Sequence, residues 1–259
     1  MERLPLLNGS GARTIAQKLG AISGGQVLDV CTGDGDFIWT LMRTLKDYES
    51  FVGVDWSKQG LKKAGKRFRR QPVQLLEMNA ENLSFETDTF DTVCIAYSLH
   101  HLGKPTVVLA EMKRVLKPGG HFILKESYQD GDQTEAQITD MRKHHWKAKI
   151  DRAFGETHNE TLTRAQIAAL FRDLGLKQAT FIESSREVRC LFCPRRFDCE
   201  NPRSKKLVDE YIKDIENELK RLTPLGAAEA LRMEGEQLKA RARKTGVSDA
   251  SILLAIGVK

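Results

Sequence analysis

The feature that most constrains the fold is an alternation of short apolar runs with helical stretches from residue 27 to residue 183. Runs this apolar suit strands that are buried on both faces, as in a parallel sheet covered by helices. The runs are 27–30, 51–54, 73–76, 92–96, 121–124 and 179–182, with a last one at 251–256. They predict an α/β fold with a Rossmann-like open seven-stranded sheet and helices on both faces.

Turn and capping signals separate these strands from the helices. The run 117–120, Lys-Pro-Gly-Gly, predicts a sharp helix end before the fifth strand. Thr163 and Gln166 have the spacing of a capping box, and Gly175 predicts the end of that helix. The basic stretch 58–70 predicts an amphipathic helix with a solvated charged face.

Residues 185–248 differ in character from the strand–helix alternation before them. Asn201-Pro202 and Thr223-Pro224 each have the pattern of a helix start, and Gly246 predicts a stop. Between them, one apolar stripe at helical spacing consists of Leu207, Val208, Tyr211, Ile212, Ile215, Leu219 and Leu222. We expect a helical insertion between the last two strands, with its stripe used for core packing or a homodimer contact.

The chain therefore divides into a main domain, residues 1–184 and 249–259, and the insertion at 185–248. Segment 128–160 follows the fifth strand and is rich in His, Lys and Trp. Ligands of open α/β sheets bind beyond the carboxyl ends of the strands. We expect segment 128–160, which leaves from such an end, to roof the site.

Composition sets limits on location and partners. Hydrophobic residues make up 41% and charged residues 29%, as in ordinary globular proteins. No apolar run approaches the roughly 20 residues that span a bilayer, and the N-terminus has no hydrophobic signal segment. Five cysteines, an odd number, fit reduced thiols and a cytoplasmic location. A net charge of +6 permits an anionic partner such as nucleic acid without requiring one.

The strongest local signal is the run 27–37, in which a buried strand enters a tight turn and then a helix. Gly33 and Gly35 would let the backbone pass close to a ligand. Asp55 ends the second strand 22 positions after Gly33, where a carboxylate can accept hydrogen bonds from both ribose hydroxyls. Trp56 follows and is suited to lie against an adenine face. The third glycine of a dinucleotide turn would fall at Ile38, and no Gly-Lys-Ser/Thr phosphate loop follows.

A series of motifs then makes the pattern specific. Besides the glycine turn, the series consists of Val54-Asp55-Trp56-Ser57, Asn79-Ala80-Glu81-Asn82-Leu83, Ser98-Leu99-His100-His101-Leu102 and the run Glu111 to Gly120. Residues 25–125 thus resemble the class I S-adenosylmethionine-dependent methyltransferases, in the broad group that includes ubiquinone and menaquinone C-methyltransferases. Cys31 replaces the first turn glycine of the family, as in its quinone-type members, so we expect a small packed residue there and no nucleophile.

The resemblance implies S-adenosylmethionine as the cofactor and assigns roles by position. Asp29 would support the turn and the amino-acid end of the cofactor, Asp55 the ribose, Asn79 to Glu81 the adenine, and Ala96 and Tyr97 the methionine part. The expected cofactor site contains Asp29, Cys31, Thr32, Gly33, Gly35, Asp55, Trp56, Asn79, Ala80, Glu81, Ala96 and Tyr97.

A sulfonium methyl group is already activated, so an enzyme of this kind mainly aligns the acceptor with it. A side-chain base is needed only for a protonated acceptor. The candidates for positioning or proton transfer are His100, His101, Glu126, Tyr128 and His145. His144, Glu156 and His158 lie in the same expected roof.

Cys190 and Cys193 have metal-ligand spacing, and Cys199 lies close by. A closed zinc site needs four ligands, and no fourth Cys or His is near in sequence. Three interpretations stay open: a metal or cluster site, thiol recognition of a soft acceptor, and unligated cysteines.

The sequence favours methylation of a small-molecule acceptor. RNA or protein methylation is the alternative, although the fourth strand ends in Ala96-Tyr97-Ser98-Leu99 and not in the Asp/Asn-Pro-Pro-aromatic turn of base-amine methyltransferases. A third interpretation is a non-catalytic scaffold that binds the cofactor and docks a partner on its helical insertion.

Overall fold

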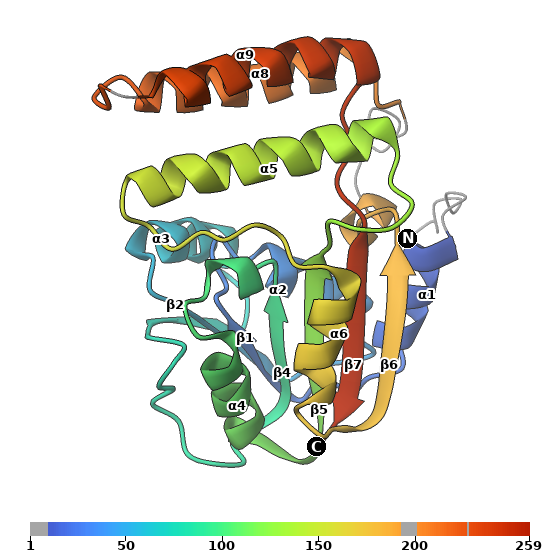
Figure 1. The fold of residues 1–259 in the computed structure, drawn as a ribbon. Helices are drawn as coiled ribbons and strands as arrows, with labels where there is room; N and C mark the ends of the chain where they lie inside the picture. The colour runs from blue at the N-terminus through green and yellow to red at the C-terminus, as the bar shows by residue number, and fades with distance from the viewer. Residues whose placement is uncertain (1–9, 193–200, 227) are drawn as a thin grey trace.

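The computed structural model describes residues 10–192, 201–226 and 228–259. Seven strands form one sheet in the order β3-β2-β1-β4-β5-β7-β6. Their bounds are β1 Gln26–Val30, β2 Ser50–Asp55, β3 Val73–Glu77, β4 Phe90–Ala96, β5 Leu116–Ser127, β6 Lys177–Ser184 and β7 Ile252–Val258. Neighbouring strands from β3 to β5 pair in parallel, and β7 lies antiparallel between β5 and β6 (Figure 1). The predicted open seven-stranded α/β sheet is confirmed.

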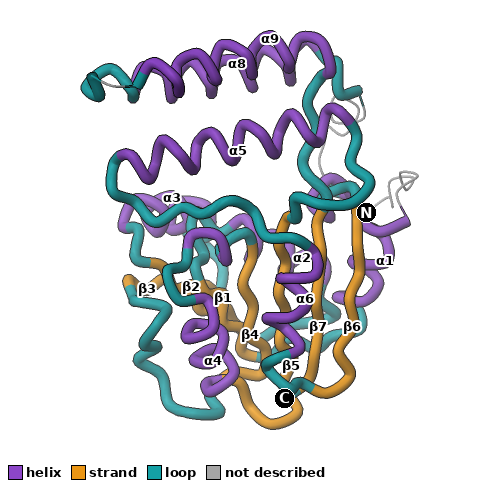
Figure 2. Tube along the Cα trace, viewed as in Figure 1, coloured by secondary structure: helices purple, strands orange, loops and turns teal. Residues whose placement is uncertain are grey.

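Both faces of the sheet are buried, because successive residues of its central strands enter different cores. Val93 packs in one core with Met112, and Cys94 packs in the other with Leu41. The first core lies under α4 (Pro105–Val115) and α6 (Arg164–Arg172). The second lies under α1 (Ser10–Leu19), α2 (Asp36–Thr44) and α3 (Lys58–Arg67). Figure 2 shows these helices around the strands.

A third layer covers the edge at which the parallel strands end. It consists of α5 (Glu135–Ala153), α8 (Lys205–Arg221) and α9 (Glu229–Thr245), and α5 is the helix nearest the sheet (Figure 1). Its own apolar core contains Trp146 of α5, Ile215 of α8 and Leu238 of α9. Most of the predicted apolar stripe of 207–222 packs in this core, so the stripe gives no support to a dimer contact.

Side-chain hydrogen bonds attach the start of α5 to the sheet. The Gln137 amide nitrogen donates to Ser251 Oγ at 3.1 Å and to the carbonyl oxygens of Ser185 and Asp249 at 3.3 Å. Thr134 and Gln137 also form a capping box, which fixes where the helix begins. The third layer is thus attached where the chain leaves β6 and enters β7.

Two predicted helix starts were wrong. The Asn201 side chain accepts a hydrogen bond from the Arg203 amide at 3.1 Å, and its carbonyl accepts one from the Ser204 amide at 2.8 Å. Asn201 therefore closes a turn of its own, and α8 begins later, at Lys205. Thr223 lies at the end of α8, where its hydroxyl donates to the Lys220 carbonyl, and α9 begins only at Glu229.

Other predicted signals agree with the structure, with one exception. Thr163 and Gln166 form the capping box of α6, and Gly246 ends α9. Helix α4 ends at Val115, and the run 117–120 lies inside the long strand β5 instead of in a turn before it. Among the described residues, every helix is too short or too polar to traverse a bilayer.

Candidate active site

A pocket of about 750 Å³ opens at the carboxyl ends of the first four strands. From β1 the chain proceeds to β2 and β3 on one side of the sheet, whereas β4 leads to β5 on the other. Loops that diverge at such a switch point leave a crevice between them, where open α/β sheets bind their ligands. The volume suits a nucleoside-sized molecule.

All predicted cofactor residues except Gly35 line this pocket. They are Asp29, Cys31, Thr32, Gly33, Asp55, Trp56, Asn79, Ala80, Glu81, Ala96 and Tyr97. Gly33 has a φ of 54°, and a Cβ added to it would meet no other atom within 4 Å, as expected for a residue that borders the pocket. Gly35 has a φ of 81°, and a Cβ there would collide with the ring of Phe68. The structure thus shows a close approach of Gly35 to a core aromatic ring, and its contact with a cofactor stays a prediction.

Asp55 fixes the glycine turn to the end of β2. Its Oδ2 accepts a hydrogen bond from the Gly33 amide and its Oδ1 one from the Ser57 amide, both at 2.8 Å. The side chain is 8% exposed and borders the pocket. Each carboxylate oxygen has two lone pairs, so both can accept one more hydrogen bond from a ligand.

Asp29 lies deeper, at the base of the pocket. Its Oδ2 accepts a hydrogen bond from the Thr32 hydroxyl at 2.6 Å, and its Oδ1 one from the Cys94 thiol at 3.3 Å. Burial of this carboxyl raises its pKa to about 7, against the opposing effects of these two donors and of the charge of Lys125. Asp29 is therefore partly protonated near neutral pH.

Two residues of the pocket wall have the left-handed backbone conformation that favours glycine. Cys31 follows β1 with a φ of 57°, and Tyr97 follows β4 with a φ of 52°. Such conformations cost an ordinary residue about 1–3 kcal/mol and cluster at ligand sites. Burial raises the pKa of the Cys31 thiol to about 12, so it stays protonated. This agrees with the prediction that Cys31 is a packed residue and not a nucleophile.

The loop after β3 forms another wall. The Asn79 side chain accepts a hydrogen bond from the Glu81 amide at 2.9 Å, which holds the loop in a turn. Glu81 Oε2 lies 3.2 Å from Lys104 Nζ. Trp56 stands at the rim and is 79% exposed, so its ring is available to stack on a bound aromatic group.

Sequence reasoning missed Lys125, which lines the pocket from β5 and is 3% exposed. Its Nζ lies 3.2 Å from Glu187 Oε2 and 4.4 Å from the centroid of the Tyr97 ring. The cation–π contact and the ion pair offset the cost of burying this charge. A signal was present, because Lys125 and Glu126 are charged residues at the end of an apolar strand.

A second cavity of about 330 Å³ adjoins the first, and Tyr97 and His101 line both. His100 and His144 also line the second cavity, beneath α5. Of the predicted candidates for positioning or proton transfer, the structure therefore brings His100 and His101 to this junction. His144, from the predicted roof, joins them.

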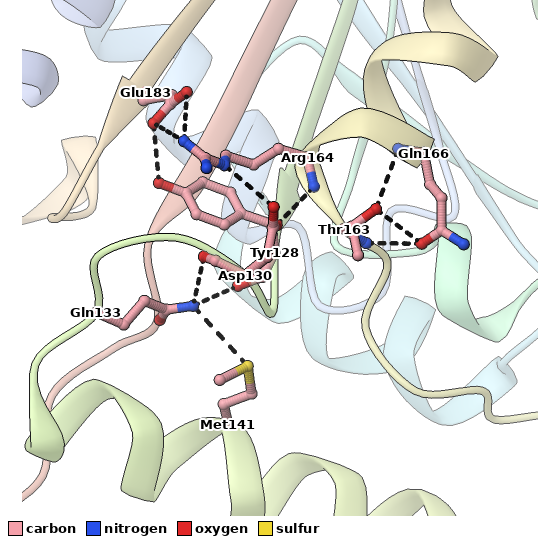
Figure 3. A network of polar contacts seen from close by, with 8 residues as sticks. All are labelled: Tyr128, Asp130, Gln133, Met141, Thr163, Arg164, Gln166 and Glu183. Carbon is pink, nitrogen blue, oxygen red and sulfur yellow. Dashed lines mark hydrogen bonds and ion pairs between the residues drawn. The ribbon is translucent and has the colours of Figure 1, made fainter.

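Tyr128 lines neither of these two cavities. Its hydroxyl lies 3.3 Å from Glu183 Oε2, and Arg164 pairs with the same carboxylate at 3.1 Å (Figure 3). The Arg164 amide donates to Asp130 at 2.8 Å. Burial raises the pKa of Tyr128 further above its usual value. This network joins the loop after β5 to α6 and β6, which indicates a structural role.

Glu126, His145 and Glu156 also have other neighbours. Glu126 Oε2 accepts a hydrogen bond from the Leu99 amide at 2.9 Å, and thereby orients the turn that carries His100. His145 Nε2 lies 3.0 Å from the Thr161 hydroxyl and lines a separate cavity beside α9. Glu156 pairs with Arg221 of α8 at 2.7 Å.

Of the predicted cysteine cluster, only Cys190 is described, and it is buried. Cys193 and Cys199 lie outside the described residues. The three interpretations of this cluster therefore stay predictions.

The part of the chain that carries most of the pocket residues is similar to known proteins. Residues 28–124 match the model of a methyltransferase domain family, Methyltransf_11. The ubiquinone/menaquinone biosynthesis C-methyltransferase UbiE of Desulfotalea psychrophila is 39% identical over 111 residues, covering 43% of this chain and 45% of that protein. A demethylmenaquinone methyltransferase of Lysinibacillus sphaericus is 29% identical over 169 residues, covering 61% of this chain and 72% of that protein. The chain thus spans less than half of the first relative.

A solved structure extends the likeness to almost the whole chain. Haemonchus contortus phosphoethanolamine N-methyltransferase 2, in complex with phosphomonomethylethanolamine and S-adenosylhomocysteine, has a TM-score of 0.56 at 17% identity. The match covers 96% of this chain and 52% of that one. At this identity the likeness shows a shared fold.

Proposed function

We propose that the chain is a class I S-adenosylmethionine-dependent methyltransferase, which transfers a methyl group from this cofactor to a small-molecule acceptor; the proposal starts from the match of residues 28–124 to a methyltransferase domain. The observation that carries the proposal is the pocket at the switch point of the sheet. It gathers the residues that the family resemblance predicts, from four different strand ends.

The pocket residues suit the parts of this cofactor. Asp55 has acceptor capacity for the ribose hydroxyls, and the loop 79–81 offers a wall for the adenine. The carboxyl of Asp29 lies where the amino-acid end is expected, and its ionised form would pair with the cationic ammonium group. When bound, the cofactor supplies a methyl group already activated by a sulfonium.

The chain's own residues then have to position the acceptor. Tyr97 and His101 form the wall shared by the two cavities, so an acceptor in the second cavity meets the cofactor pocket there. Holding two reactants in line can contribute about 7–11 kcal/mol to lowering the barrier. Helix α5 lines the second cavity with Asp140, Met141 and His144, and the loop after it contributes Thr157 to the first.

The size of the second cavity supports a small acceptor. About 330 Å³ suits a metabolite, whereas an RNA strand or a protein loop needs an open groove. Two relatives are named as quinone-pathway methyltransferases, which supports the same acceptor class.

The test of the cofactor site is Asp55→Ala. We expect it to weaken S-adenosylmethionine binding at least tenfold, or about 1.4 kcal/mol, since it removes both the ribose acceptor and the anchor of Gly33. Titration calorimetry measures the affinity. Asp47→Ala, at an exposed aspartate outside the pocket, is the matched control. Unchanged affinity in Asp55→Ala would contradict this placement of the ribose.

The test of the reaction is transfer of a labelled methyl group to cell extract separated into metabolite, RNA and protein fractions. We expect the label in the metabolite fraction. Label in RNA or protein would assign the activity to another acceptor class. Cofactor binding without transfer to any fraction would favour a scaffold.

A further inference from the structure

Three histidines from separate segments converge above the second cavity. His100 lies in the short helix η1 (Leu99–His101) after β4, His144 lies on α5, and His158 follows α5. One ring nitrogen of each lies within 4.8 Å of the other two. His100 and His158 are buried, and His144 is half-buried. Because the three are distant in sequence, only the tertiary fold reveals the group.

The spacing of two of these nitrogens matches a metal site. His144 Nε2 and His158 Nε2 lie 3.3 Å apart. In tetrahedral zinc sites, with Zn–N distances of about 2.0–2.1 Å, neighbouring ligand nitrogens lie roughly 3.3–3.4 Å apart. This pair therefore already has the separation that two ligands of one ion require.

Buried carboxylates lie behind two of the imidazoles. Asp151 Oδ2 lies 2.7 Å from His158 Nδ1, which places the proton of a neutral ring on Nδ1 and leaves Nε2 with a lone pair. Glu126 Oε1 lies 3.3 Å from His100 Nδ1, and this nitrogen makes no hydrogen bond within the described part of the chain. A carboxylate behind a histidine ligand fixes its tautomer and orientation in metal sites.

The surroundings of the group also suit a cation. Asp151 is buried, and its carboxylate pairs with His158 and with Arg221 of α8. Three imidazoles backed by a carboxylate thus surround the shared point.

We propose that His100, His144 and His158 bind a divalent transition-metal ion, with Zn²⁺ as the best match. Imidazole nitrogens suit zinc and its neighbours, whereas Mg²⁺ and Ca²⁺ take oxygen ligands. Three protein ligands leave the fourth tetrahedral position open, as in catalytic zinc sites.

The open position gives the ion a role toward the acceptor, which rests on the proposed function. His100 and His144 line the second cavity, beside the wall that it shares with the cofactor pocket. A hydroxyl or thiol bound to the ion there releases its proton to solvent and remains as the metal-bound anion. The geometry thus selects an acceptor with an ionisable O–H or S–H group.

Metal binding is tested on the full chain, stripped with a chelator and dialysed against Zn²⁺. We expect one bound equivalent by elemental analysis, and affinity at least 100-fold lower in His144→Ala and in His158→Ala. Asp151→Asn leaves the ligands in place and should weaken binding about 10–100-fold. His145→Ala, at the next position of α5 and facing another cavity, is the matched control.

Cobalt substitution gives a readout that does not depend on any variant. Co²⁺ in the wild-type chain should show tetrahedral absorption without thiolate charge-transfer bands, and Cys193→Ser should leave it unchanged. No stoichiometric ion in the wild-type chain, thiolate bands, or loss of metal in Cys193→Ser alone would overturn the proposal. So would unchanged affinity in His144→Ala and His158→Ala that fold by circular dichroism. Cofactor calorimetry on the stripped chain separates these outcomes from failure of the proposed function.

Discussion

The carboxyl of Asp29 lies among neutral donors at the base of the pocket, and burial raises its pKa to about 7. The unfolded chain ionises this group near pH 4. Between these values the folded state holds a proton that the unfolded state has lost. Its contribution to the free energy of unfolding therefore falls as pH rises through this window.

We expect the free energy of unfolding of Asp29→Asn, whose side chain cannot ionise, to lack this decrease with rising pH. From pH 4 to pH 8, wild type should lose up to about 4 kcal/mol relative to the variant, the equivalent of a shift of about three pKa units. Urea unfolding across this range measures the difference. Parallel curves for the two proteins would show that Asp29 keeps an ordinary pKa in the folded state.

The backbone at Cys31 gives a second prediction for a single residue. A φ of 57° disfavours β-branched side chains most strongly, so Cys31→Val should lower the free energy of unfolding by about 1–3 kcal/mol. Cys31→Gly should cost less than about 1 kcal/mol, because glycine adopts this conformation without strain. Chemical denaturation of both variants tests this. Equal losses would mean that side-chain packing, and not the backbone, decides the residue at this position.

Single residues of the site were predictable where a motif fixes their place in the chain. Asp29, Asp55 and Gly33 occupy strand ends and a turn, so local sequence was enough to place them. The positions of Lys125 and His158 in the site depend on how distant segments pack. The packing of Gly35 against Phe68, which joins α2 to the end of α3, likewise depends on the tertiary fold.

Among the elements, α9 packs tightly against α5 and α8 at Gly235. A Cβ there would lie 2.8 Å from Trp146 Cζ2 and 2.9 Å from Leu219 Cδ2. Trp146 is fully buried, and its indole nitrogen donates to the Leu231 carbonyl at 2.8 Å. The three helices of the third layer, α5, α8 and α9, thus pack around Trp146 and Gly235.

We expect Gly235→Val to lower the free energy of unfolding by about 1–3 kcal/mol, because the added atoms must displace Trp146 or Leu219. Met233→Ala, at an exposed position of the same helix, should change it by less than about 0.5 kcal/mol. Thermal unfolding followed by tryptophan fluorescence and circular dichroism gives both values. Equal stability of Gly235→Val and wild type would show that α9 is free to move away from α5.

The strands were predictable as elements because their apolar runs are continuous. The starts of α8 and α9 were not, since Asn201 and Thr223 have the composition of helix caps but make their hydrogen bonds in turns. A capping residue and a turn residue use the same side-chain chemistry. Only the completed backbone distinguishes them.

For the whole molecule, the pocket couples ligand binding to stability. A ligand that binds only the folded state at 100 times its dissociation constant stabilises it by about 2.7 kcal/mol. S-Adenosylhomocysteine should therefore raise the Tm of this chain by several degrees. At the same concentration, the tenfold weaker Asp55→Ala should gain only about half of that stabilisation. A shift of equal size in both proteins would place the ligand away from Asp55.

The sheet class followed from the alternation of strands and helices, but β7 begins at Ile252, far in sequence from the end of β6 at Ser184. Where β7 enters the sheet could not be read from residues 251–256, because an apolar run fits an interior position on either side of a parallel strand. Hydrogen bonds with both β5 and β6 determine that position.

The place of β7 has a consequence for how the chain folds. Strands β5 and β6 do not pair with each other, and each pairs instead with β7, Ile252–Val258, which lies between them. During synthesis, β5 and β6 leave the ribosome first. Helices α8 and α9 follow, and β7 is made only after them. We expect the nascent protein to hold open, aggregation-prone edges until its last strand arrives, and to depend on chaperones during that interval.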